Sequence, residues 1–105
     1  MVKRAAPREH EVVVCYDISD GKLRQKLADA LLDIGLIRVQ KSVFWGRLRP
    51  ADEKAIAREL RAYVDGGQDR AFFCRLELSS VIESNGFGYL PSELTEANPN
   101  HVFID

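Results

Sequence analysis

The hydrophobic positions of the chain first form a continuous run and then recur at helical spacing. Residues 12–16 are apolar or β-prone without a polar break, which is typical of a strand covered on both faces. Asp17 interrupts this run while the chain is still extended. A carboxylate at the edge of an apolar layer is costly unless a metal ion, a cation or N–H donors compensate its charge. Asp17 is therefore the first candidate for a functional residue.

A helix is predicted directly after this strand. Asp20 or Ser19 can serve as its N-cap, and Gly35 stands where a left-handed C-cap is expected. Between these caps, one apolar stripe recurs at helical spacing: Leu23, Leu27, Ala30, Leu31 and Ile34. The chain then returns through residues 36–46, which are rich in β-branched and aromatic types. The first half thus reads as strand, helix and strand.

A further helix and then a further strand are predicted in the second half. Pro50 fits the first position of a helix that ends before Gly66 and Gly67. Residues 71–78 alternate, which predicts a strand with one buried face that carries the apolar side chains: Phe72, Cys74, Leu76 and Leu78. Residues 79–100 hold turn-forming and polar types, and residues 101–105 again resemble a strand.

The predicted architecture is an α+β, ferredoxin-like βαββαβ sandwich. In that arrangement two helices cover one face of an antiparallel sheet. We expect a basic tail over residues 1–10 and a single domain over residues 11–105. Cys15 and Cys74 lie in strand-like runs, so we interpret both as small buried apolar residues.

Composition and charge limit the possible partners. The net charge is -1, but residues 1–49 carry a net +4 and residues 50–105 a net -5. A folded chain with this asymmetry can present one basic face despite its nearly neutral total. The sequence contains neither a signal-peptide pattern nor an apolar stretch approaching the roughly 20 residues of a membrane span. We expect a cytoplasmic protein with no membrane association.

Three segments together resemble the Cas-two family of CRISPR-associated proteins: residues 16–20, residues 35–40 and residues 42–46. The likeness covers about residues 12–48 in unbroken order. It implies a homodimer whose C-terminal strand adds to the partner's sheet, and a role in spacer acquisition with the Cas-one integrase. It also implies metal-dependent endonuclease activity on single-stranded RNA or duplex DNA.

The resemblance also implies site residues. Asp17 matches the metal-binding aspartate of the family, with Mg²⁺ or Mn²⁺ as the expected cofactor. Magnesium commonly uses only one or two carboxylates, so two copies of Asp17 facing each other across a two-fold axis could hold one ion. The alternative is a turn carboxylate that accepts the N–H groups of residues 19–21. Asp20 is interpreted first as a helix cap.

The predicted nucleic-acid contacts share basic character or a match to family positions near the cleft: Arg24, Lys26, Arg38, Ser19, Ser42 and Phe44. Arg24 and Lys26 lie two apart, so they splay around the helix, and a solvated helix face is an equal alternative for both. Arg38 is the stronger candidate, because an unpaired guanidinium among apolar strand residues is disfavoured. Phe44 and Trp45 are more consistent with a core or an interface than with base stacking.

Three other functions remain open on the sequence. The chain could be a non-catalytic scaffold that bridges integrase dimers, in which case Asp17 is vestigial. It could be a toxin-like ribonuclease of the related VapD type, which shares the fold. It could also be a ligand-sensing ferredoxin-like domain, which salt-dependent DNA binding would exclude.

Overall fold

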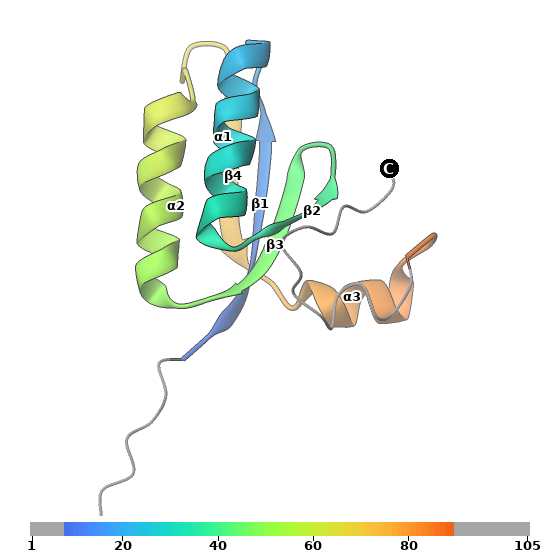
Figure 1. Cartoon of the computed structure of the whole chain (residues 1–105). Helices are drawn as coiled ribbons and strands as arrows, with labels where there is room; N and C mark the ends of the chain where they lie inside the picture. Colours follow the sequence, from blue (N-terminus) through green and yellow to red (C-terminus); the bar gives the residue numbers. More distant parts are fainter. Residues whose placement is uncertain (1–7, 90–105) are drawn as a thin grey trace, which may run out of the picture.

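A computed structural model of the chain describes residues 8–89. Over this range the elements are β1 (His10–Asp17), α1 (Gly21–Ile34), β2 (Ile37–Gln40), β3 (Val43–Leu48), α2 (Pro50–Tyr63), β4 (Arg70–Arg75) and α3 (Leu78–Asn85). The strands form one antiparallel sheet in the order β2-β3-β1-β4, with α1 and α2 side by side against it (Figure 1). This confirms the predicted ferredoxin-like arrangement. None of the helices in residues 8–89 has the length and apolar composition needed to cross a membrane.

Helix α1 begins and ends where the sequence predicts. Oδ1 of Asp20 accepts hydrogen bonds from the backbone N–H groups of Lys22 and Leu23, at 2.8 and 3.0 Å. Gly35 has a φ of +120° and its N–H donates to the carbonyls of Leu31 and Leu32. These caps satisfy backbone groups that the helix itself leaves unpaired.

The main core lies between the sheet and the two helices. Strand β1 contributes Val12, Val14 and Tyr16 to it, and these pack with Phe44 of β3 and with buried residues of the helices: Leu27, Ala28, Leu31 and Ile56. The opposite face of the sheet, here called the open face, carries a smaller cluster of Val13, Ile37, Val39 and Trp45. The sheet is thus apolar on both sides, as the unbroken run in β1 predicts.

The prediction for β4 was wrong about which face is buried. Ala71 and Phe73 pack against the core under the helices, whereas Phe72 on the open face is 59% exposed. Cys74 is also exposed, which corrects the expectation that it is buried. The reason is that α1 and α2 cover the side that carries Phe73, and nothing in the described part of the chain covers Phe72. Strand β4 also ends at Arg75 rather than continuing to Leu78.

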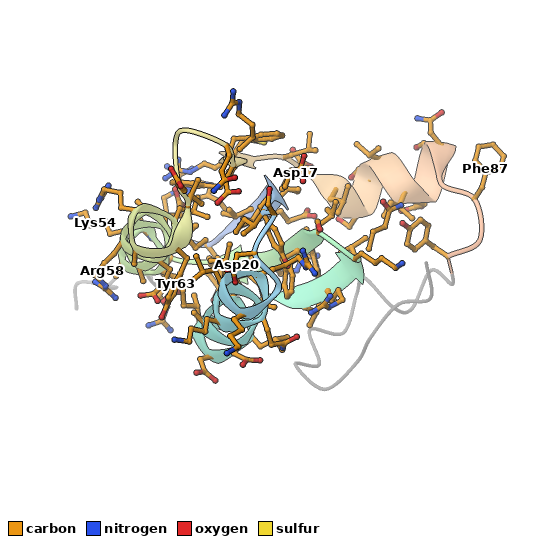
Figure 2. The ribbon with its side chains drawn as sticks, turned by 90° about the horizontal axis from the view of Figure 1, so that it is seen from above. Asp17, Asp20, Lys54, Arg58, Tyr63 and Phe87 are labelled. Atoms are coloured by element: carbon orange, nitrogen blue, oxygen red, sulfur yellow. The ribbon has the colours of Figure 1, made fainter. Side chains whose placement is uncertain are left out.

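Helix α3 was not predicted. Its apolar residues Leu78 and Ile82 pack on the open-face cluster around Trp45, on the side of the sheet away from α1 and α2 (Figure 2). The start of α3 is held by Glu11, whose carboxylate accepts from the N–H of Ser79 at 2.9 Å and from its hydroxyl at 2.8 Å. Because this cap comes from β1, no pattern within residues 78–85 reveals it. The predicted strand at 101–105 lies outside the described residues, as do residues 1–7 of the predicted tail.

Candidate metal and nucleic-acid site

Asp17 is the last residue of β1 and its side chain is exposed. Side chains alternate along a strand, so Asp17 is on the side of Val13 and Cys15, the open face. Across the sheet it lies opposite Arg70 of β4. No hydrogen bond or ion pair involves its carboxylate within residues 8–89. Asp17 therefore offers free oxygen ligands at the rim of the sheet (Figure 2).

The alternative role for Asp17, as a turn carboxylate, is not seen. The N–H of Ser19 donates to Oδ1 of Asp69 at 3.1 Å, and Asp20 accepts the next N–H groups of the helix. Asp69 is 4% exposed. Its pKa is lowered from the usual value by the N–H of Ser19 and then by that of Asp65. The local N–H donors are thus taken by Asp20 and Asp69, which leaves Asp17 available.

A groove of about 460 Å³ begins at Asp17 and runs between α1 and the β2–β3 hairpin. It is lined by Tyr16, Asp17, Ile18, Arg24, Gln25, Ala28, Arg38, Lys41 and Ser42. Three of these residues are cations that come from α1, from β2 and from the hairpin turn. The fold therefore brings together Asp17, Arg24, Arg38 and Ser42, which the sequence proposed separately.

The two arginines are held in place by the backbone of the site. Nη1 of Arg24 donates to the carbonyl of Ile18 at 2.8 Å. Nη1 of Arg38 donates to the carbonyl of Lys41 at 2.9 Å, and its guanidinium lies 5.0 Å from the centroid of the Phe44 ring. Each guanidinium keeps further N–H donors for a ligand, because the group carries five. Arg38 is thereby satisfied among its apolar neighbours, as its position in the strand requires.

Phe44 is fully buried, as the core interpretation predicts. It contacts two residues that line the groove. Its ring stacks on Tyr16 with centroids 6.0 Å apart, while Arg38 covers it from the groove side. Trp45 is also fully buried. Phe44 is thus a support for Arg38 and Tyr16 rather than a platform for bases.

Tyr16 is a site residue that the sequence analysis did not select. It is 6% exposed, and its hydroxyl has no hydrogen-bond partner within residues 8–89. Burial raises the pKa of this phenol, and Arg38 and Arg24 oppose the rise. A buried hydroxyl without a partner is unfavourable, so its position beside two guanidinium groups favours a bound anion as its acceptor. The one feature of the sequence that could have pointed to Tyr16 is its position directly before Asp17.

The other two predicted nucleic-acid contacts, Lys26 and Ser19, do not line the groove. Lys26 is exposed and does not line the groove, while Arg24, two residues earlier, does. Ser19 is exposed beside Asp17 and contributes its backbone N–H to Asp69. Lys41 lines the groove and was missed, because a lysine in a hairpin turn carries no distinguishing pattern. The roles of all these side chains remain predictions.

The oxygen ligands that the described part of one chain offers are too few to hold a metal ion alone. Within residues 8–89 no group of three or more His, Cys, Asp or Glu side chains could hold an ion. Asp17 is free, whereas Asp20 and Asp69 accept backbone N–H groups. Because Mg²⁺ often keeps several waters and takes one or two carboxylates, the residues fit an ion that two copies of Asp17 share.

Comparison with known proteins identifies a family. The family model described as CRISPR associated protein Cas2, the Cas-two family named above, matches residues 10–81. The chain is 47% identical over 55 residues to CRISPR-associated endoribonuclease Cas2 2 of Pyrobaculum aerophilum, a match that covers 52% of this chain and 60% of that protein. The chain thus spans about three fifths of that relative's length.

Two further proteins extend this comparison. A CRISPR-associated endonuclease Cas1/endonuclease Cas2 fusion of Thermoproteus tenax is 44% identical over 63 residues, which cover 59% of this chain and 24% of the fusion. The crystal structure of Streptococcus pyogenes Cas2 superposes with a TM-score of 0.57 at 30% identity, covering 65% of this chain and 87% of that chain. The similarity therefore holds in sequence and in fold.

Proposed function

Because this chain belongs to the Cas2 family of CRISPR-associated proteins, we propose that it acts in spacer acquisition as a homodimeric, metal-dependent endonuclease. In this proposal it cuts phosphodiester bonds of single-stranded RNA or duplex DNA and binds DNA together with a Cas1 integrase. The relative from Pyrobaculum aerophilum carries the name endoribonuclease, and the fusion from Thermoproteus tenax the name endonuclease. Both names support nuclease activity.

One observation carries the proposal: a free carboxylate stands at the mouth of a groove lined by three cations. Asp17 lies at one end, and Arg24, Arg38 and Lys41 line the walls. Cations at these positions suit the oxygens of a phosphodiester, and planar guanidinium groups can bind them in a bidentate manner. A carboxylate at the same place opposes an anionic ligand unless a divalent cation lies between them. The combination therefore favours a phosphodiester and a metal ion together.

The residues of the chain then have separate tasks. Arg24 and Arg38 bind and orient the phosphate, and the hydroxyl of Tyr16 donates to one of its oxygens. Asp17 from each subunit holds Mg²⁺ or Mn²⁺. The chemistry that such an ion supplies is polarisation of a phosphoryl oxygen and activation of a water for attack on phosphorus.

A homodimer completes the site in this proposal. Phe72 on β4 is 59% exposed on the open face, and both Phe72 and Asp17 line a second hollow of about 210 Å³. Contact between two open faces would bury Phe72 and bring the two copies of Asp17 towards one axis. A Cas1 partner is supported by the fusion in Thermoproteus tenax, in which Cas1 and Cas2 form one chain.

The test is cleavage of labelled single-stranded RNA and duplex DNA by the wild-type protein and by Asp17→Asn, with Mg²⁺, with Mn²⁺ and with a chelator. We expect Asp17→Asn to lose cleavage by about a hundredfold or more, as does chelation, since metal activation of water supplies several kcal/mol. Binding to the same substrates should persist, because Arg24 and Arg38 are unchanged. The matched control is Asp33→Asn, an exposed aspartate on α1. Equal cleavage by Asp17→Asn and wild type would remove the metal-binding role of Asp17, and no cleavage by the wild-type protein with either metal would remove the enzymatic proposal.

A second function, a non-catalytic bridge between integrase dimers, is favoured because Asp17 is the one acidic residue that lines the groove and because no group of three or more His, Cys, Asp or Glu side chains within residues 8–89 could hold an ion. It makes a different prediction. The wild-type protein would then bind DNA and support integration with Cas1, show no cleavage with either metal, and tolerate Asp17→Asn.

A further inference from the structure

The outer face of α2 carries charge of a single sign. Lys54, Arg58 and Arg61 follow one another at i, i+4 and i+7, and all three are exposed. This spacing places them on one side of the helix, opposite the buried Ile56. The remaining exposed residues of α2 are uncharged: Pro50, Ala51 and Ala62. The three cations are called the α2 ridge below.

The acidic residues of α2 lie on its flanks and are engaged there. Oδ2 of Asp52 accepts the N–H of Arg49 at 3.1 Å, and Glu53 forms an ion pair with Arg75 of β4 at 3.2 Å. Glu59 lies 3.7 Å from the Nε of Arg58. That pair is weak, since the Arg58 side chain is 70% exposed and exposed pairs contribute little. The ridge therefore keeps its positive charge.

The neighbouring helix α1 has no exposed face of a single charge. Its exposed residues include Lys22 and Lys26 but also Asp29 and Asp33. Charges of both signs are interspersed there, which is the usual pattern of a solvated helix face. The α2 ridge differs because no acidic residue interrupts it.

The geometry of the ridge suits a nucleic-acid duplex. From Lys54 to Arg61 the helix rises about 10 Å, which corresponds to about three phosphates along one strand of a duplex. Proteins that bind single strands combine such cations with aromatic platforms on which bases stack, and the outer positions of α2 carry none. The small side chains of Ala51 and Ala62 next to the cations allow a close approach. These features favour the phosphates of a rigid duplex as the ligand.

The ridge is separate from the groove at Asp17. Lys54 lines a shallow hollow with Pro50, Phe73 and Arg75, next to the edge strand β4, whereas the groove lies beside β2 at the other edge of the sheet. In Figure 2 Lys54 and Arg58 project from the far side of α2, well apart from Asp17. The ridge and the groove are therefore separate surfaces.

We propose that the α2 ridge is a second nucleic-acid contact of this protein, which binds the phosphate backbone of duplex DNA without reading its sequence. The inference rests on the proposed function, because it assigns a further surface to the same class of ligand. Each cation that neutralises a phosphate adds about 0.9 to the magnitude of the slope of log affinity against log salt concentration.

The experiment measures binding of the full chain to a duplex DNA between about 50 and 200 mM salt. The triple variant Lys54→Gln/Arg58→Gln/Arg61→Gln should lower the magnitude of the slope by about 2 to 3 and weaken binding at low salt by about tenfold or more. The matched single variants are Arg58→Gln, which should lower the slope by about one, and Lys22→Gln on α1, which should leave it unchanged. Arg58→Lys/Arg61→Lys should restore wild-type binding, because the ridge acts through charge.

The variants separate failure of this inference from failure of the proposed function. If the triple variant and Lys22→Gln both match wild type while Arg24→Gln/Arg38→Gln loses binding, the ridge has no role and the groove stands. If the wild-type protein binds no duplex at low salt, the inference and the DNA-binding part of the proposed function both fail. Loss of duplex binding in the triple variant, with cleavage of single-stranded RNA intact, supports the ridge as a separate surface.

Discussion

The backbone N–H of Ser19 donates to Oδ1 of Asp69, although the two residues are 50 positions apart in the sequence. The other oxygen of Asp69 accepts the N–H of Asp65 at 3.0 Å. One buried carboxylate therefore ties the loop after Asp17 to the loop that joins α2 and β4. Asp69 does not line the groove, so it acts on the site by fixing the backbone next to Asp17.

Asp69→Asn should slow cleavage because it displaces the backbone next to Asp17, and it should leave substrate binding unchanged. The amide keeps one acceptor but presents an NH₂ group to one of the two N–H donors, so the loop at Ser19 loses a bond. Small displacements of a reacting group cost about tenfold to a hundredfold in rate. We expect kcat to fall by that amount with KM nearly constant, measured by steady-state cleavage assays.

The matched control for this variant is Asp65→Asn in the same loop. The Asp65 side chain accepts from Gly67 and Gln68 within its own turn, so kcat should stay near the wild-type value. A rise in KM for Asp69→Asn with kcat unchanged would contradict the positioning role and indicate a contact with substrate.

Tyr16→Phe should separate stability from activity. The phenol hydroxyl is buried without a partner in the described part of the chain, so its removal relieves an unsatisfied polar group. The free energy of unfolding should remain unchanged or rise by up to about 1 kcal/mol, as measured by urea denaturation. Phosphate binding should weaken, with cleavage about tenfold slower, because the groove loses one donor beside Arg24 and Arg38.

Tyr63→Phe on α2 is the control for this change, since Tyr63 lies outside the groove. It should leave cleavage unaltered. Full activity in Tyr16→Phe would mean that the hydroxyl does not contact the substrate.

The features that depend on local chemistry were predictable from the sequence. Asp20 and Gly35 cap α1 through bonds that span only a few residues. Pro50 at the start of α2 and the apolar run of β1 were recognised in the same way. These signals define most of the order of elements, which is sufficient to predict the ferredoxin-like sheet. Residues 36–46, predicted as one returning strand, instead form β2 and β3 with a turn at residues 41–42.

The features that depend on distant partners were not predictable. Helix α3 is capped by Glu11, 68 positions away from Ser79, and the exposed face of β4 depends on what α1 and α2 cover. Alternation along β4 shows that two faces differ but not which one lies under the helices. In the site, the arrangement of Arg24, Arg38 and Asp17 around one groove follows from sheet register, which the sequence specifies only through the fold.

Glu11 should control the docking of α3 in a pH-dependent manner. Its carboxylate accepts from Ser79 and from Nε1 of Trp45 at 2.9 Å. Burial raises the pKa of Glu11, but the bonds from Ser79 and Trp45 and the charge of Arg47 outweigh it, so the pKa lies below 4.5. A lowered pKa contributes stability that is present above the ordinary value and is lost as the pH falls through the value in the folded protein.

Trp45 is the only tryptophan of the chain, so its fluorescence reports this contact. We expect the emission of the wild-type protein to stay constant from pH 8 to about 5 and to change below about 4.5, as α3 loosens. Glu11→Gln should remove this transition and lower stability by about 2 kcal/mol, since hydrogen bonds to charged groups contribute about 1.5–3 kcal/mol. The control Glu83→Gln on the exposed side of α3 should leave both quantities unchanged. An identical pH profile in Glu11→Gln would assign the transition to another group.

Phe72→Glu should dissociate the proposed dimer. Phe72 lies opposite Cys15 on the open face and is 59% exposed in one chain. Burying an aromatic side chain stabilises by about 1.5–3 kcal/mol, and a two-fold interface contains it twice. The dissociation constant should therefore increase by about a hundredfold or more, as measured by analytical ultracentrifugation. Cleavage should decrease in parallel, because each metal site needs Asp17 from both subunits.

Phe87→Glu is a control with the same chemistry at a different place. Phe87 is 90% exposed at the end of α3 and projects away from the sheet (Figure 2). Its replacement should leave the dimer and the cleavage rate intact. If Phe87→Glu dissociates the dimer while Phe72→Glu does not, the subunits meet through α3. The two copies of Asp17 would then not be brought together by the open faces, and shared metal binding would lose its structural basis.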